Sequence, residues 1–132
     1  MQKRIHVAVG VIINKQKQVL LAKRLDHLHQ GGKWEFPGGK VEQNESVTEA
    51  LIRELKEEVD LNVNQTTEFM DISHDYPDKH VRLDIHLVTD FNGTAVGLEG
   101  QQVKWVDFDS LKDYEFPEAN QPILDKLLTL VF

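Results

Sequence analysis

The sequence predicts a mixed α/β fold. Residues 4–13 (RIHVAVGVII) form a nearly continuous β-branched, apolar run, typical of a strand buried on both faces. Residues 81–89 (VRLDIHLVT) alternate apolar and polar side chains, as a strand with one core face does. Between them, Ser46 and Glu49 form a Ser-x-x-Glu capping box ahead of an apolar stripe, which indicates an amphipathic helix. Strands before and after a helix favour a layered α/β domain.

Length and composition narrow the class of protein. The chain has 132 residues and is 40% hydrophobic, so we expect one domain over residues 1–132. It has no cysteine, which excludes disulfides, thiolate metal sites and cysteine nucleophiles. Its apolar runs are too short to span a bilayer and it opens on no signal-like segment, so a cytoplasmic protein with no membrane partner is expected. The net charge of -7 argues against binding polymeric nucleic acid but is compatible with a small nucleotide.

The chain ahead of the helix is expected to form strands joined by polar turns. Residues 14–17 predict a turn, and residues 18–24 predict the return strand of a hairpin with the first strand. Residues 25–33 are a polar loop. Residues 34–36 predict a short strand, closed at residues 37–39 by a Pro-Gly-Gly turn whose glycines can take positive φ and approach a ligand closely.

Strands and a second helix are expected after the first helix. Residues 67–76 and 81–89 predict an antiparallel pair, and residues 103–108 predict a last short strand. Glu99 lies between glycines in the loop before that strand, where a lone carboxylate is usually just solvated. The terminal helix is predicted by an apolar stripe of Ile123, Leu124, Leu127 and Leu128.

Three carboxylates crowd onto the first helix. Glu54, Glu57 and Glu58 stand at positions i, i+3 and i+4, on neighbouring turns. Like charges at this spacing each cost roughly 0.2–0.5 kcal/mol in an isolated helix unless a positive charge lies against them. A hard divalent cation with phosphates is one explanation. A solvated acidic face is the commoner explanation of so short a pattern.

The wider pattern resembles the signature of a known family. It runs from Gly39 over five residues to Glu45, then over seven residues to residues 53–61 (RELKEEVDL), and is similar to the box of the Nudix hydrolases. Asp60 stands where the family has glycine. Because Asp tolerates a left-handed backbone better than most residues, we expect a modest loss of stability and unchanged chemistry.

The resemblance covers nearly the whole chain. The segments AVG, WEFPGGKVEQNE, YPDKH, LEGQ and FPEANQP are similar to the MutT branch of the family, which sanitises oxidised guanine nucleotides. This resemblance implies a Nudix-type α/β/α sandwich with a mixed β-sheet between helices. It also implies a monomer that hydrolyses 8-oxo-dGTP to the monophosphate and pyrophosphate, with Mg²⁺ as cofactor and Mn²⁺ as an alternative ion.

The same resemblance implies roles for individual residues. The residues that match the metal and catalytic positions are the Gly38 carbonyl, Glu54, Glu57, Glu58 and Glu99, with Glu54 as the first candidate for general base. Those that match substrate positions are Arg24 and His29 for phosphates or sugar, Glu35, Phe36, Pro37 and Gly38 along the nucleotide, and Asn120 for the modified base. Those that match bracing positions of the box are Gly39, Glu45 and Arg53.

Position alone gives several of these residues simpler roles. Arg24 ends a strand and can meet solvent, His29 lies in a surface loop, and Asn120 can cap the terminal helix. Two other functions also remain open. One is a Nudix hydrolase of another nucleotide, such as CTP, or of a nucleotide sugar. The other is a nucleotide sensor without turnover, which the intact set of carboxylates disfavours.

Overall fold

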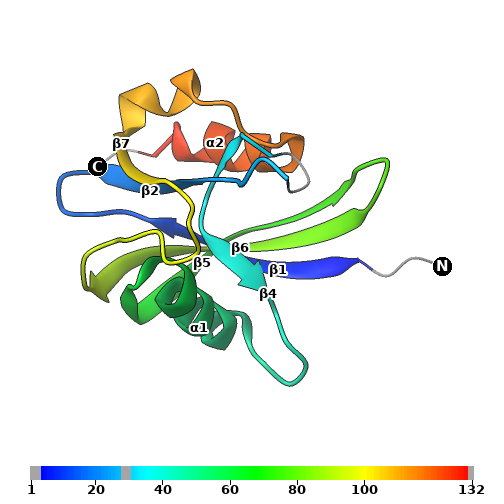
Figure 1. The fold of residues 1–132 in the computed structure, drawn as a ribbon, viewed down its shortest axis with the longest axis horizontal. Helices are drawn as coiled ribbons and strands as arrows, with labels where there is room; N and C mark the ends of the chain where they lie inside the picture. Colours follow the sequence, from blue (N-terminus) through cyan, green and yellow to red (C-terminus); the bar gives the residue numbers. More distant parts are fainter. Residues whose placement is uncertain (1–3, 28–30, 131–132) are drawn as a thin grey trace.

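A mixed four-stranded sheet lies between two helices, with α1 on one face and α2 on the other (Figure 1). The computed structural model describes residues 4–27 and 31–130. This arrangement confirms the α/β/α sandwich that the family resemblance implies. The elements in chain order are β1 (Ile5–Ile12), β2 (Gln18–Lys23), β3 (Trp34–Glu35), β4 (Gly38–Lys40), α1 (Val47–Val59), β5 (Asn62–Asp75), β6 (His80–Asn92), β7 (Val103–Asp107), the 3-10 turns η1 (Phe108–Asp113) and η2 (Glu118–Asn120), and α2 (Gln121–Leu127).

The central sheet has the strand order β4-β1-β6-β5, and a second sheet has the order β3-β2-β7. β1 pairs with β6 in parallel, while β4 and β5 are antiparallel to their neighbours. The predicted hairpin of β1 with β2 is therefore wrong, although the turn at residues 14–17 forms and one bridge joins Ile13 to Val19. Both edges of β1 are already hydrogen-bonded, so β2 leaves it and pairs with β3 and β7 instead.

Alternate side chains of β1 enter the two cores of the molecule. Val9 and Val11 point toward α2 and pack with Ile85 of β6. Ala8 and Ile12 point toward α1. The sheet is therefore buried on both faces, as the apolar sequence of its first strand predicted.

Both ends of α1 follow from local sequence. Ser46 Oγ accepts a hydrogen bond from the Glu49 amide at 3.1 Å, and Glu49 Oε1 accepts one from the Ser46 amide at 2.9 Å, which confirms the capping box. The helix ends at Asp60, whose φ of 60° and ψ of 35° are the expected left-handed conformation. Lys56 lies one turn earlier and its Nζ is 2.9 Å from Asp60 Oδ1.

Two other expectations are corrected. Gly38 and Gly39 do not form a turn with positive φ but pair with β1 as part of β4. The close approach seen at Gly38 is to the neighbouring strand, because a Cβ there would collide with the carbonyl of Ala8. Leu128 lies beyond the last residue of α2 and is 48% exposed, so it does not extend the buried stripe. Within residues 4–27 and 31–130, no helix has the length and apolar character needed to cross a membrane.

Candidate active site

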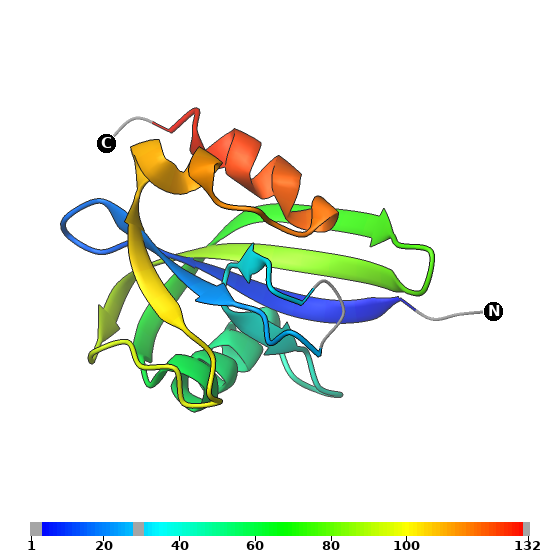
Figure 2. The same cartoon turned by 45° about the horizontal axis from the view of Figure 1, so that its top comes forward.

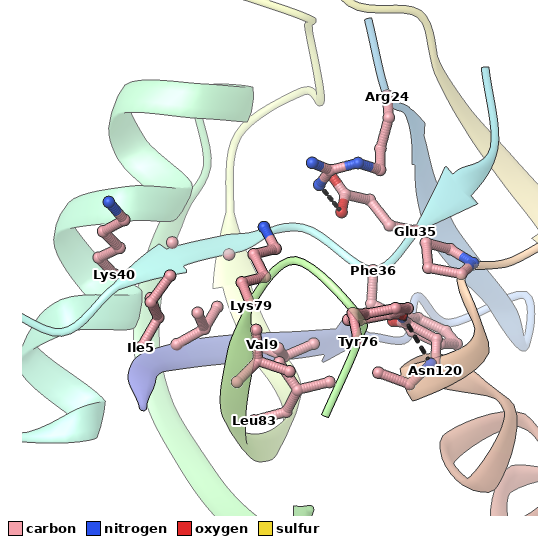
Figure 3. Close-up of a pocket in the computed structure, with 16 residues that line it drawn as sticks. Ile5, Val9, Arg24, Glu35, Phe36, Lys40, Tyr76, Lys79, Leu83 and Asn120 are labelled. Carbon is pink, nitrogen blue, oxygen red and sulfur yellow. Dashed lines mark hydrogen bonds and ion pairs between the residues drawn. The ribbon is translucent and has the colours of Figure 1, made fainter. Parts of the chain in front are cut away.

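A pocket of about 300 Å³ opens beside β4, between the β5–β6 turn and the segment that precedes α2 (Figure 3). Its walls include five of the seven residues predicted to meet substrate: Arg24, Glu35, Phe36, Gly38 and Asn120. Pro37 is buried next to these residues, and His29 lies outside the described residues. The structure thus brings together side chains that the sequence places almost one hundred positions apart.

A buried ion pair forms one wall of the pocket. Arg24 at the end of β2 and Glu35 of β3 are 2.7 Å apart, and both side chains are largely buried. Burial raises the pKa of Glu35, while the charge and hydrogen bond of Arg24 act in the opposite direction. Lys79, from the β5–β6 turn, also lines the pocket, and its pKa is lowered first by burial and then by Arg24. This wall therefore carries two basic side chains, Arg24 and Lys79, and one carboxyl group, Glu35.

Asn120 enters the pocket from the other side. The residue is 8% exposed and sits at the start of α2, but its side chain makes no capping hydrogen bond. Its amide is therefore not used in the simpler role that its position suggested. The backbone of the preceding residue is held in place, because the Ala119 amide donates a hydrogen bond to the hydroxyl of Tyr76 at 2.9 Å. Tyr76 itself lines the pocket.

Glu58 is the buried member of the acidic set on α1, with 7% of its surface exposed. This burial differs from the solvated acidic face that is the commoner explanation of the sequence pattern. The pKa of Glu58 is raised to about 8, mainly by burial and further by the negative charges of Glu35, Glu99 and Glu54. The hydrogen bond from the Gly38 amide opposes this rise. The negative charges of one strand, one loop and one helix therefore act on the same carboxyl group.

Arg53 holds the other carboxylates of the set. Its Nη1 is 2.6 Å from Glu54 Oε1 and 3.6 Å from Glu57 Oε2. Its Nε and Nη2 each donate to the Glu45 carboxylate at 2.9 Å, and this pairing lowers the pKa of Glu45 to about 2. Burial raises the pKa of Glu54, and the hydrogen bond and charge of Arg53 oppose the rise. The Arg53 side chain thus binds Glu54 and also binds Glu45, in the loop before α1.

Gly39 leaves the space that the Glu54 carboxylate occupies. A Cβ on this residue would collide with the carboxyl carbon of Glu54 and with its Oε2. Gly39 and Glu45 therefore contact side chains of α1, and Arg53 of α1 is the residue that binds Glu45.

Glu99 comes from the connection between β6 and β7 and is exposed. Its charge raises the pKa of both Glu54 and Glu58, so the loop carries it to the acidic end of α1. In the part of the chain that the structure describes, no three His, Cys, Asp or Glu side chains are already grouped as metal ligands. The donor atoms themselves are carboxylate and carbonyl oxygens, which suit a hard cation such as Mg²⁺.

Sequence reasoning missed Lys40, Tyr76 and Lys79 as pocket residues. In the sequence, the YPDKH segment pointed only to the family resemblance. Lys79 could have been predicted from the position of the tight turn after β5, which lies over the side of the sheet where the pocket opens.

Comparison with known proteins gives a consistent result. The sequence model of one family, described as NUDIX domain, matches residues 8–126. The 8-oxo-dGTP diphosphatase of Escherichia coli K12 is 36% identical over 128 residues, which are 97% of this chain and 99% of that protein. The CTP pyrophosphohydrolase of the same organism is 33% identical, over 92% of this chain and 90% of that protein. A solved structure described as MutT from Aliivibrio salmonicida and Vibrio cholerae has a TM-score of 0.84 at 42% identity, covering 96% of this chain and 98% of that one.

Proposed function

The chain belongs to the Nudix family, and from this premise we propose that it hydrolyses 8-oxo-dGTP to the nucleoside monophosphate and pyrophosphate. The bond broken is the one between the α- and β-phosphoryl groups, with water as the nucleophile. Removal of the oxidised nucleotide from the pool would prevent its mutagenic incorporation into DNA.

The burial of Glu58 among other carboxyl groups carries the proposal. Burial and the neighbouring carboxyl groups raise the pKa of Glu58 to about 8, and a positive charge close to it would favour its ionised form. The residues therefore fit a divalent ion. The proposed ligands of Mg²⁺, or of Mn²⁺ in its place, are the Gly38 carbonyl and the carboxylates of Glu54, Glu57, Glu58 and Glu99.

In the proposed reaction Glu54 is both an ion ligand and the general base, and Arg53 orients its carboxylate. When bound, Mg²⁺ would withdraw charge from the phosphates and lower the pKa of a water molecule. Glu54 accepts the proton of the attacking water, and its raised pKa brings it closer to the working pH, as a general base requires. Arg53 holds Glu54 Oε1 at 2.6 Å and so fixes the direction in which the carboxylate faces.

The pocket beside β4 receives the nucleoside. Asn120 offers one donor and one acceptor on the same amide, the combination that reads a purine edge. Arg24 and His29 are proposed to meet the phosphates or sugar, and Glu35, Phe36, Pro37 and Gly38 to line the nucleotide. The cations of Arg24 and Lys79 on the pocket wall support an anionic ligand of this size.

A second candidate substrate is CTP, supported by the 33% identity to a CTP pyrophosphohydrolase. A nucleotide sugar is a further alternative, because the acidic helix determines the diphosphate chemistry and not the leaving group. A nucleotide sensor without turnover is disfavoured, because every carboxylate of the box is retained. We also propose that residues 1–132 form one Nudix domain that acts as a monomer in the cytoplasm, which light scattering and cell fractionation would test.

The proposal is tested by Mg²⁺-dependent release of pyrophosphate at low substrate concentration from 8-oxo-dGTP, dGTP, CTP and dATP, and by Mg²⁺-dependent cleavage of ADP-ribose. The expected result is a kcat/KM for 8-oxo-dGTP far above that for dGTP. A preference for CTP or ADP-ribose would keep the chemistry and change the substrate. Tight binding of a nucleotide with Mg²⁺ and no hydrolysis would instead support the sensor.

A further inference from the structure

The connection between β6 and β7 lies against the C-terminal end of α1 (Figures 1 and 2). The Val96 amide donates to the Val59 carbonyl and the Leu98 amide to the Glu58 carbonyl, both at 3.0 Å. Carbonyls in the last turn of a helix have no partner within the helix, so they need donors from elsewhere. The connection supplies these donors and so lies against the acidic helix.

Gln101 adds a two-sided link at the same place. Its Nε2 donates to the Glu58 carbonyl at 3.0 Å, and its Oε1 accepts from the Glu99 amide at 2.9 Å. A side-chain amide can donate and accept at once, which a carboxylate or an alkyl side chain cannot do. The turn is tight at Gly97, where a Cβ would collide with the Gln101 carbonyl.

We propose that Gln101 is a positioning residue that holds Glu99 in register with Glu58. This inference rests on the proposed function, in which both carboxylates serve the same ion. Glu99 needs such a support because it is exposed and is followed by Gly100, which has a φ of 84°. A flexible carboxylate binds an ion less well than one already held in place, since its freedom must be lost on binding.

The test compares Gln101→Met with Gln102→Met. The two residues are adjacent and of one type, but the Gln102 side chain is exposed, and no hydrogen bond of its side chain is seen among the described residues. For Gln101→Met we expect kcat to fall by about ten- to a hundredfold and Mn²⁺ affinity without nucleotide to weaken by a similar factor. KM for the nucleotide should change little, because the pocket is untouched. Gln102→Met should match the wild type in all three quantities.

Loss of stability alone would not lower kcat or Mn²⁺ affinity well below the melting temperature. Wild-type values of both in folded Gln101→Met would overturn the inference. A second measurement needs no variant: in the wild-type protein without metal, the Glu99 amide should be protected from hydrogen exchange, and exchange at the rate of an unstructured peptide would also overturn it.

The variant Glu99→Gln separates this inference from the proposed function. If Glu99→Gln retains full turnover and Mn²⁺ affinity, the assignment of Glu99 fails and Gln101 has nothing to position. If Glu99→Gln is impaired and Gln101→Met is not, only the positioning inference fails.

Discussion

The backbone amide of Gly38 donates a hydrogen bond to Glu58 Oε2 across 3.3 Å, which joins β4 to the last turn of α1. Gly38 lines the pocket beside β4 and Glu58 belongs to the acidic helix, so this bond links the two parts of the candidate site. The amide favours the ionised carboxylate, but burial and the neighbouring charges act more strongly in the opposite direction.

Glu58 makes the stability of the metal-free protein depend on pH. Its folded-state pKa of about 8 lies above the ordinary value of 4.5, so the folded state retains a proton that the unfolded state loses. Its contribution to stability is complete below about 4.5 and is lost as pH rises through about 8. Urea midpoints of the EDTA-treated protein should therefore fall across this window. In Glu58→Gln the fall should be much smaller, and an equal fall in both proteins would exclude Glu58 as its source.

Mg²⁺ should reverse this loss at high pH. Because a bound ion favours ionised ligands, it stabilises the folded state more where the proton is already absent. The rise in Tm on adding Mg²⁺ should be larger near pH 8 than near pH 6. A rise that does not depend on pH would place the ion away from Glu58.

Removal of the charge from the proposed base should abolish most turnover. Glu54→Gln and Glu58→Gln are expected to lower kcat by about 10²- to 10⁴-fold with the fold intact, because proton acceptance or ion binding is lost. Circular dichroism would check the fold. Glu68→Gln, on the exposed surface of β5, is the matched control. Near-normal turnover in either site variant would remove that residue from the mechanism.

Asn120→Ala should weaken discrimination between 8-oxo-dGTP and dGTP. One lost base contact corresponds to about 1–3 kcal/mol, or roughly five- to 150-fold in the ratio of the two kcat/KM values. Asn64→Ala, at an exposed site where the amide bonds Asp90, controls for the loss of a side-chain amide. Unchanged selectivity in Asn120→Ala would show that another residue recognises the modified base.

Arg53→Lys should impair activity although it keeps the charge. Lysine cannot donate to Glu45 through two nitrogens and also hold Glu54, so the Glu54 carboxylate loses its orientation. We expect kcat to fall by about ten- to a hundredfold, the cost of a small displacement of a reacting group. Arg82→Lys, which breaks a similar two-nitrogen pair with Asp71 on the surface, should leave kcat unchanged. Equal turnover in both variants would show that charge alone suffices at position 53.

Asp60→Gly should stabilise the protein. Asp60 has a φ of 60°, which glycine adopts without a steric cost, and its contact with Lys56 is exposed and contributes little. We expect the free energy of unfolding to rise by about 0.5–1 kcal/mol in urea titration. Asp60→Ala keeps the steric cost of a Cβ at positive φ, so its free energy of unfolding should be lower than that of the wild type. A loss of stability in Asp60→Gly would mean that the pair with Lys56 outweighs the backbone strain.

Sequence predicted best those features that depend on neighbouring residues. The capping box of Ser46 and Glu49 and the left-handed Asp60 are both decided within one or two turns of α1. The partner of β2 was predicted wrongly, because strand pairing depends on which edges distant segments leave open. The burial of Glu58 could not be predicted from the apolar stripe of its helix, since Gly38, which bonds its carboxylate, comes from a separate strand.

The parallel pairing of β1 with β6 also bears on how the chain folds. Residues Ile5–Ile12 pair with residues Val81–Val88, so the middle of the sheet closes only after a loop of more than seventy residues. The α1 helix lies between these strands in the sequence and docks on side chains from both, including Ala8 and Val88. During synthesis, an emerging chain that has completed α1 still lacks β5 and β6, which supply part of the surface to which this helix binds. The acidic residues should therefore acquire their final arrangement late, in a step limited by long-range contacts.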